Sequence, residues 1–584
     1  MSKKFETYRQ LNYPIPEKTR SWNMYGAGIE NIGRDGKPEE FTLSQPADDQ
    51  ILVRVDAVGM CFSDVKLIKQ GGAHPKLYNR DLANNPTRVG HEAAVTVIQV
   101  GKDLTKQYFP GQRLAIQPDI YQNQMSTAYG YSIPGGLIQY HLIGPEVLDA
   151  DGGAYVIPIE GNLGYAEVAL TEPWACVEAA YTQRRRLTPK NEGIMWIIGQ
   201  SSDTSRYTFT SGLDAPSTIV VTDIPEDLKH TILANKRKDC QVIERPHILP
   251  QDYPALNTEL REGRGFDDII VLQPCSAEQV SAAAKLIGFR GTFNLVGNEP
   301  LDGEPLIDVG RIHYHYTTYI GSAGTDIAAS YGENRNRCGL RTGGTAVFVG
   351  AGGPMGQMHV QRALELEKGP ALVIATEVND FRLAALEKIC APLAAARGKR
   401  LLTFNPAKAP VTTADFVNQA TDGHGADDAV VCVPIASLME EAARLLVPDG
   451  MLVFFAGVPA GTFAHLDLSR VYLHNLQLTG TSGSTMDDQR LVIRKTLNGQ
   501  LSPNRSVAAV GGIESARDGI QAMMTGVYAG KVLIFPQISG LPLVSLDEFR
   551  DRFPDIGKHL GENNLWTREA EKALIEKFWT GAVE

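Results

Sequence analysis

Three side chains of metal-binding type lie in the N-terminal third of this 584-residue chain. They are Cys61 in "GMCFSDVK", His91 in "VGHEAAV" and Glu172 in "LTEPWACVEA". A thiolate, an imidazole and a carboxylate suit zinc, and three protein ligands leave a fourth position open for water or substrate, as in catalytic zinc sites. The pattern therefore suggests a catalytic metal, although a single Cys, His or Glu is more often structural.

A second group of residues has the pattern of a dinucleotide site. From Gly344 the chain reads "GTAVFVGAGGPMGQMHV", an apolar strand, a glycine-rich turn and the start of a helix. Such a turn lets the backbone approach a pyrophosphate at the helix N-terminus. An acid about 20 residues farther on binds ribose hydroxyls and disfavours a 2′-phosphate, so we expect NAD rather than NADP. The predicted cofactor residues are Gly350, Gly352, Gly353, Pro354, Met355, Gly356 and Glu377.

Two regions with different secondary-structure patterns must position these residues. From about 50 to 115 the chain alternates in short strands, "ILVRVDAVGMC", "EAAVTVIQVG" and "GQRLAI", which predicts an irregular β-rich domain. From Gly193 onward, short apolar runs alternate with helical stretches, as expected for βα units and a parallel sheet.

The α/β part repeats itself. "GIMWIIG", "TIVVTDI", "FDDIIVLQP" and "IDVGRIHYH" recur in the same order as "GTAVFVG", "LVIATEV", "ADDAVVCVP" and "LDLSRVYLH", at shifts of 151 to 160 residues. The alternative is that the matches reflect only the strand and helix pattern common to all parallel α/β sheets. The shared D-D and D-x-x-R residues go beyond that common pattern. We therefore predict two Rossmann-like modules in tandem.

The two copies differ where a cofactor would bind. The earlier copy reads "GQSSDTSRYTFTSG" after its first strand, so only Gly199 remains of the glycines and larger residues would crowd a pyrophosphate. We therefore predict NAD in the later copy. The earlier copy is open to three roles: a packing spacer, a dimerisation surface, or a site for another nucleotide through Asp223. A structural role is favoured.

Composition narrows the class of protein. Hydrophobic residues make up 43% and charged residues 21%, as in soluble globular chains, and the formal net charge of −11 argues against nucleic acid or an anionic membrane as partner. No secretory signal and no apolar run of ~18 residues is present, so we expect a cytoplasmic location. The seven cysteines are scattered and form no CxxC pair, which indicates neither a disulfide framework nor a zinc knuckle.

The order G-x-C-x-S-D, G-H-E and E-P, followed by a strand and the glycine turn, resembles the zinc-dependent medium-chain dehydrogenase/reductase superfamily. The resemblance covers about 30–190 and 343–540 and is closest to the sorbitol dehydrogenase and L-sorbose 1-phosphate reductase branch. It implies Cys61, His91 and Glu172 as the zinc set, with Glu92 as an alternate or exchanging ligand. Ser63 falls where the family bonds the reacting alcohol.

Two further positions follow from the resemblance. Asp64 falls where a carboxylate orients an imidazole ligand. Lys66 falls at a proton-relay position and could equally be a surface lysine. The four clustered cysteines of a structural zinc site are absent, so we predict one zinc per chain.

The expected fold is α/β, with a β-rich (GroES-like) catalytic domain and two Rossmann-like modules. The catalytic domain spans 1–188 and is completed by 504–538. The degenerate module spans 189–342 and the NAD module 343–503. A helical extension, 539–584, covers a surface or an oligomer contact. We expect a homo-oligomer, either a dimer or a tetramer.

The expected function is hydride transfer between NAD and a secondary alcohol of a polyol, sugar or sugar phosphate. Lys76, Arg80 and Arg88 are candidates to meet a phosphate, although a solvated loop is the favoured interpretation. Two alternatives stay open. One is an NAD-dependent sugar lyase or epimerase that oxidises its substrate transiently, and the other is a nucleotide-binding protein without catalysis.

Overall fold

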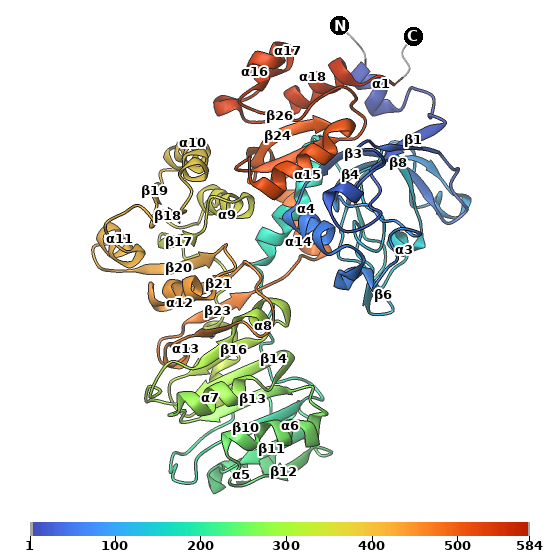
Figure 1. Cartoon of the computed structure of the whole chain (residues 1–584). Helices are drawn as coiled ribbons and strands as arrows, with labels where there is room; N and C mark the ends of the chain where they lie inside the picture. The colour runs from blue at the N-terminus through green and yellow to red at the C-terminus, as the bar shows by residue number, and fades with distance from the viewer. Residues whose placement is uncertain (1–3, 582–584) are drawn as a thin grey trace.

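The catalytic domain is built on one mixed sheet. The computed structural model describes residues 4–581, and its eight-stranded sheet has the order β26-β24-β25-β3-β4-β5-β9, with β8 paired to β3. Segments from both ends of the chain share this sheet (Figure 1), because the chain returns to it after the second module. Its strands are β3 Ile51–Gly59, β4 Glu92–Val100, β5 Arg113–Ile116, β8 Tyr140–Ile143, β9 Val156–Pro158, β24 Val507–Gly512, β25 Lys531–Phe535 and β26 Val544–Ser545.

Two parallel six-stranded sheets confirm the tandem repeat. Their orders are β12-β11-β10-β13-β14-β16 and β19-β18-β17-β20-β21-β23, so the third, second, first, fourth, fifth and sixth strands of each module lie side by side. The earlier sheet contains β10 Ile194–Ile198, β11 Thr218–Thr222, β12 Gln241–Glu244, β13 Phe266–Leu272, β14 Ile287–Val296 and β16 Thr318–Ser322. The later sheet contains β17 Thr345–Val349, β18 Leu372–Thr376, β19 Arg400–Phe404, β20 Ala426–Val431, β21 Leu446–Phe454 and β23 Gln477–Gly480.

The D-D pairs of the repeat hold each module in the same way. In the earlier module Arg186 pairs with Asp268, and the backbone N–H of Ile194 donates to Asp267 at 2.9 Å. In the later module Arg337 pairs with Asp428. There the N–H of Thr345 donates to Asp427 at 2.8 Å. The repeat therefore extends to side chains that the sequence match marked but did not explain.

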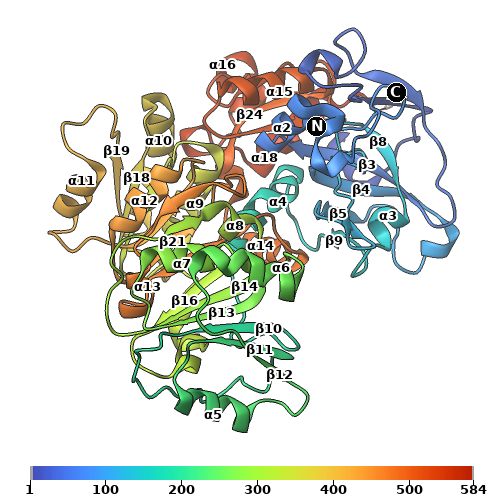
Figure 2. The ribbon, with the colours of Figure 1, turned by 60° about the horizontal axis from the view of Figure 1, so that its bottom comes forward.

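The two modules meet at their edges. β15 (Leu306–Asp308) of the earlier module pairs antiparallel with β22 (Phe463–His465) of the later one, and the edge strands β16 and β23 lie against each other. Helices α8 (Val309–Tyr314) and α13 (Ser469–Leu473) each reach across to the other module's sheet. Both ribbon views place these elements at the junction (Figures 1 and 2). The edge that each sheet would otherwise expose is thus covered within the chain, and the dimer or tetramer stays a prediction.

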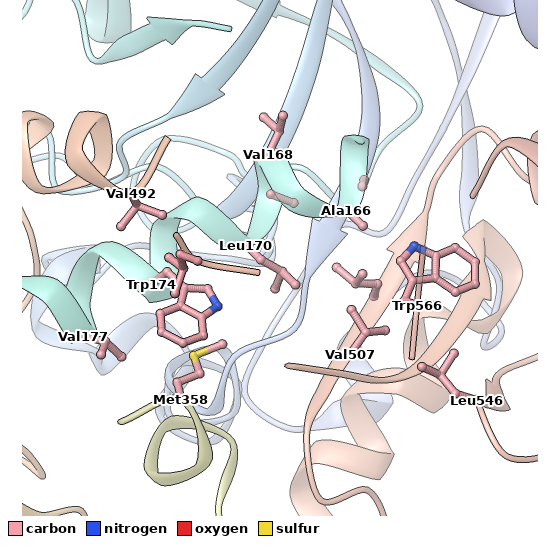
Figure 3. Packing of buried hydrophobic residues seen from close by; sticks show 14 of the residues in the cluster. Ala166, Val168, Leu170, Trp174, Val177, Met358, Val492, Val507, Leu546 and Trp566 are labelled. Carbon is pink, nitrogen blue, oxygen red and sulfur yellow. The ribbon is translucent and has the colours of Figure 1, made fainter. Parts of the chain in front are cut away.

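Helix α4 (Tyr165–Ala179) joins the catalytic domain to the NAD module. Figure 3 shows Trp174 of α4 among buried apolar side chains that include Met358 and Val492. At the other end of α4 a carboxylate of the C-terminal helix α18 (Arg568–Phe578) caps the helix: Glu571 accepts hydrogen bonds from the N–H groups of Tyr165 and Ala166 at 2.7 and 2.8 Å. The segment from 539 onward therefore buttresses the catalytic domain, to which it also contributes β26.

No helix within residues 4–581 is long and apolar enough to cross a membrane.

Candidate active site

The ends of two paired strands bring three metal-binding groups together. β3 ends at Gly59, and Met60 alone separates it from Cys61. His91 directly precedes β4, and Glu92 begins β4 opposite Gly59. Their ligand atoms all lie within 4.8 Å of one another. Glu92 is completely buried and His91 nearly so, whereas Cys61 is half-buried. Such a set of sulfur, nitrogen and oxygen atoms is able to hold zinc.

Asp64 fixes the imidazole of this cluster. It lies in the first turn of α2 (Phe62–Gln70) and bonds His91 Nδ1 at 3.1 Å, while the N–H of Cys61 donates to its other oxygen at 3.0 Å. With Nδ1 bonded to Asp64, Nε2 of His91 faces Ser63 Oγ at 3.4 Å. Burial lowers the pKa of His91, but Asp64 and Cys61 together raise it well above its usual value. A carboxylate behind a metal-binding imidazole is the usual supporting group.

A lysine that the sequence analysis missed completes the cluster. Lys531, at the start of β25, is buried and forms an ion pair with Glu92 Oε1. The second oxygen of that carboxylate, Oε2, is buried and has no hydrogen-bond partner. A buried anionic oxygen without a partner is costly, and a cation bound there would satisfy it. The residues present therefore fit a bound metal.

The structure places Glu172 beside this group rather than in it. Glu172 lies on α4 and accepts a hydrogen bond from the Cys176 thiol at 3.7 Å. Burial raises the pKa of Glu172 to about 7, and the charges of His91 and Glu92 act on it at the same time. The three grouped side chains are thus those of Cys61, His91 and Glu92, and Glu172 as the third ligand stays a prediction.

The glycine turn has the backbone geometry of a phosphate-binding loop. It joins β17 to α9 (Pro354–Glu365). Gly350 has a φ of +72°, a conformation that favours glycine. A Cβ on Gly356 would lie 2.7 Å from the Ala351 Cα, so the helix packs against the turn too closely for a side chain. Gly353 caps α9 and Pro354 occupies its first turn.

Glu377 lies where the turn and the second strand meet. The N–H of Gly352 donates to its Oε2 at 3.0 Å, and the N–H groups of Val378 and Asn379 donate to its Oε1. A Cβ on Gly352 would collide with the Glu377 side chain, at 2.6 Å. The acid is therefore positioned by the turn itself.

One cavity is lined both by Cys61 of the metal cluster and by Pro354 and Met355, which directly follow the glycine turn. This cavity has a volume of about 300 Å³. Its lining residues are Cys61, Phe62, Pro354, Met355, Arg382, Met523, Met524, Thr525, Gly526, Tyr528 and Lys531. The fold thus brings the turn next to Cys61 although nearly 300 residues separate them in the chain, as expected if the two predicted sites act together.

Comparisons with known proteins agree with this geometry. The alcohol dehydrogenase GroES-like domain family matches residues 47–151. L-sorbose 1-phosphate reductase of Klebsiella pneumoniae is 28% identical over 325 residues, which cover 53% of this chain and 76% of that protein. The structure of 2R,3R-butanediol dehydrogenase from Bacillus subtilis has the same fold, with a TM-score of 0.50 and 14% identity over 89% of this chain and 99% of that one.

These matches support a place in the medium-chain dehydrogenase/reductase superfamily, near its sorbitol dehydrogenase branch. Uncharacterized protein YggP of Escherichia coli (strain K12) is 23% identical over 571 residues, which cover 96% of this chain and 98% of that protein. That match spans both Rossmann-like modules, whereas the reductase match covers about half of the chain.

The earlier module departs further from a dinucleotide site than the later one does. Between β10 and β11 the structure has no helix, so the element whose N-terminus would hold a pyrophosphate is missing. The buried side chains of Tyr207, Phe209 and Leu213 fill this side of the sheet instead. A cavity of about 490 Å³ remains at the strand ends, with several carboxylates in its lining, among them Asp203, Asp223 and Glu244. Both findings disfavour a pyrophosphate.

The remaining predicted residues lie in three different settings. Ser63 Oγ lies 3.1 Å from Cys61 Sγ, and Lys66 is exposed one turn farther along α2. Arg80 and Arg88, by contrast, donate to backbone carbonyls such as those of Ser132 and Gly135, at 2.8 and 2.9 Å. The two arginines therefore hold loops together. Lys76 forms an ion pair with Asp119 at 3.0 Å.

Proposed function

We propose that this dehydrogenase uses zinc and NAD to oxidise a secondary alcohol of a polyol, sugar or sugar phosphate, or to reduce the corresponding ketone. The single observation that supports this most is the cavity lined by both Cys61 and the Pro354–Met355 turn. A hydride acceptor and a Lewis acid must lie within reach of one carbon atom, and this cavity gives them a common space. The name of the Klebsiella relative supports a sugar-phosphate substrate.

Cys61 and His91 would hold the metal, with Glu92 or Glu172 as the third ligand. A zinc ion bound there supplies Lewis-acid polarisation of an alcohol oxygen. The glycine turn and Glu377 would hold NAD, which would supply the hydride acceptor.

The other side chains position the alcohol and move its proton. Ser63 Oγ lies within hydrogen-bond distance of the Cys61 sulfur and near His91, so it borders the position of the reacting hydroxyl and would accept its proton. The next step outward is Lys66 or solvent. Asp64 holds the His91 ring through Nδ1 and so keeps Nε2 directed at the cluster. Lys531 neutralises Glu92 when that carboxylate is not a ligand.

Metal analysis and a turnover assay test this proposal. Purified protein should contain one zinc per chain and should form NADH, followed by its near-ultraviolet absorbance, when given NAD with a polyol or a polyol phosphate. Cys61→Ala should lose the zinc and lower kcat/KM by roughly 1000-fold or more, since the polarising group is lost. Cys275→Ala, which changes an exposed cysteine of the earlier module, is the matched control and should keep both.

Two outcomes would contradict the proposal. Full activity of the Cys61→Ala enzyme without zinc would exclude metal-assisted chemistry at this site. Conversion of a sugar with no net change in NADH would instead indicate a lyase or epimerase that returns the hydride.

A further inference from the structure

We propose that the degenerate Rossmann-like module forms one wall of the substrate cleft. In this arrangement His313 and Tyr314, at the end of α8, contact the part of the substrate that is remote from the reacting carbon. The inference rests on the proposed function and assigns to residues 189–342 a role in substrate selection.

The end of α8 lies directly on the NAD module. The ring nitrogen Nδ1 of His313 is 3.1 Å from the carbonyl oxygen of Phe454, the last residue of β21. A Cβ placed on Gly457 would lie 2.5 Å from Tyr314 Oη and 2.8 Å from His313 Nε2, so both side chains pack against the loop that follows β21. A dinucleotide lies across the carboxyl ends of the strands of such a sheet. Because Glu377 at the end of β18 marks the adenosine half, the end of β21 belongs to the nicotinamide half.

The same two side chains face the catalytic domain. Burial and, to a smaller extent, the charge of Lys66 lower the pKa of His313 to about 4, while the hydrogen bond to Phe454 opposes them. Lys76 likewise acts on the phenol of Tyr314, whose pKa is raised by burial. Lys66 lies one turn after Ser63 on α2. The helix end therefore lies within electrostatic range of α2, the helix that also carries Ser63.

Hydrogen bonds fix this junction of three parts of the chain. Tyr316 Oη, two residues beyond α8, donates to the carbonyl oxygen of Ser482 at 2.7 Å. Two residues farther on, Ser484 accepts from Gln117 Nε2 of the catalytic domain at 3.0 Å. A Cβ on the intervening Gly483 would lie 2.3 Å from Asp119, the partner of Lys76. The loop 482–484 thus ties the degenerate module to the catalytic domain.

The chemistry of this wall suits a polyhydroxylated molecule. Because His313 Nδ1 bonds a carbonyl oxygen, that nitrogen carries the proton and Nε2 is an acceptor. Tyr314, 41% exposed, offers a hydroxyl, and Lys66 and Lys76 offer positive charge. Hydroxyls along a sugar alcohol both donate and accept hydrogen bonds, and a terminal phosphate accepts from the lysines. A short substrate of up to four carbons would leave this wall unused.

The internal repeat supplies a matched control. Tyr472 occupies the position in α13 that His313 occupies in α8, and it packs against Gly321 of the earlier module. Its hydroxyl donates to the carbonyl oxygen of Glu299, in the earlier module, at 2.5 Å. Tyr472→Phe therefore changes the equivalent contact without touching the cleft.

The test compares substrates of different length in the zinc-loaded, full-length enzyme. Steady-state kinetics would use 2,3-butanediol, xylitol, sorbitol and sorbitol 6-phosphate as probes, with Tyr314→Phe, His313→Asn and Tyr472→Phe. We expect Tyr314→Phe and His313→Asn to raise KM for the longer polyols about fivefold each, the size expected for one lost hydrogen bond. KM for butanediol, the Kd for NADH and the zinc content should stay unchanged, and Tyr472→Phe should alter none of them.

Two other outcomes are informative, and they distinguish failure of the substrate-wall proposal from failure of the proposed function. If Tyr314→Phe and His313→Asn changed KM equally for short and long substrates, or for neither, the proposal that these residues contact the substrate would be rejected. The dehydrogenase assignment would stay intact. A wild-type enzyme that oxidises none of the four probes and reduces none of the corresponding ketones would reject the proposed function and, with it, this inference.

Discussion

The two Rossmann-like modules share a scaffold and differ at one connection. Each has six parallel strands in the same order, and each buries the second aspartate of a D-D pair against an arginine. Only the later module places a glycine turn and a helix after its first strand; the earlier one has a loop anchored by aromatic side chains. The sheet and its ion pairs are therefore separable from cofactor binding, which depends on one strand-to-helix connection.

Among the differences between the two modules, the largest effect is expected from a substitution in this strand-to-helix connection. Gly352→Val should weaken NAD binding and lower kcat/KM by about 100-fold, because a side chain at this position collides with Glu377 and displaces the turn. Ser201→Val changes the equivalent position of the earlier module, which is exposed, and should have no effect on either quantity. NADH fluorescence titrations measure the binding. A comparable loss in Ser201→Val would mean that the earlier crevice also takes part in cofactor binding.

The shared scaffold predicts equal losses of stability in the two modules. Arg337→Ala and Arg186→Ala should each lower the free energy of unfolding by about 3 kcal/mol, since each leaves a buried aspartate without its cation. Burial raises the pKa values of both Asp428 and Asp268. Differential scanning calorimetry of the two variants would measure the change. If one variant melted like the wild type, the two ion pairs would not be equivalent.

Glu365 of the later module should contribute a pH dependence of its own. Burial raises the pKa of Glu365 in α9 to about 7, above its unfolded value near 4.3. Between these values the folded state holds a proton that the unfolded state has lost, so this part of the stability is complete below about pH 4 and falls as pH rises toward 7. Glu365→Gln should remove up to about 3 kcal/mol of this fall.

Melting temperatures at pH 5 and pH 8 measure it. The wild type should lose more stability than Glu365→Gln between the two pH values. Below pH 4 the stabilities of the two proteins should change with pH in the same way. An identical pH dependence of the two proteins would show that Glu365 is ionised in the folded state.

The sequence predicted the repeat and the glycine turn because both are local patterns. Strand-turn-helix texture around Gly350 and the recurring D-D pairs can be read within a few residues of one another. It did not predict Lys531, which reaches Glu92 from a strand more than 400 residues away in the chain. Nor did it decide between Glu92 and Glu172 as the third ligand. Both carboxylates lie near Cys61 and His91, and only their positions in the folded structure show that Glu92 is grouped with these residues.

The missing helix of the earlier module was also beyond sequence reasoning. Loss of the glycines indicated that the turn was unsuited to phosphate, but the aromatic residues that replace the helix show no periodicity. The contact of His313 with Phe454 likewise depends on how two modules dock, and no local pattern encodes such docking.

The pairing of β15 with β22 sets how the junction responds to dilution. Two modules held by separate chains would part as the protein concentration fell, whereas modules on one chain meet at an effective concentration fixed by the connection between them. The strand pair Leu306–Asp308 with Phe463–His465 is intramolecular. A cleft wall built on it is therefore as complete in a nanomolar assay as at the concentration of the cell.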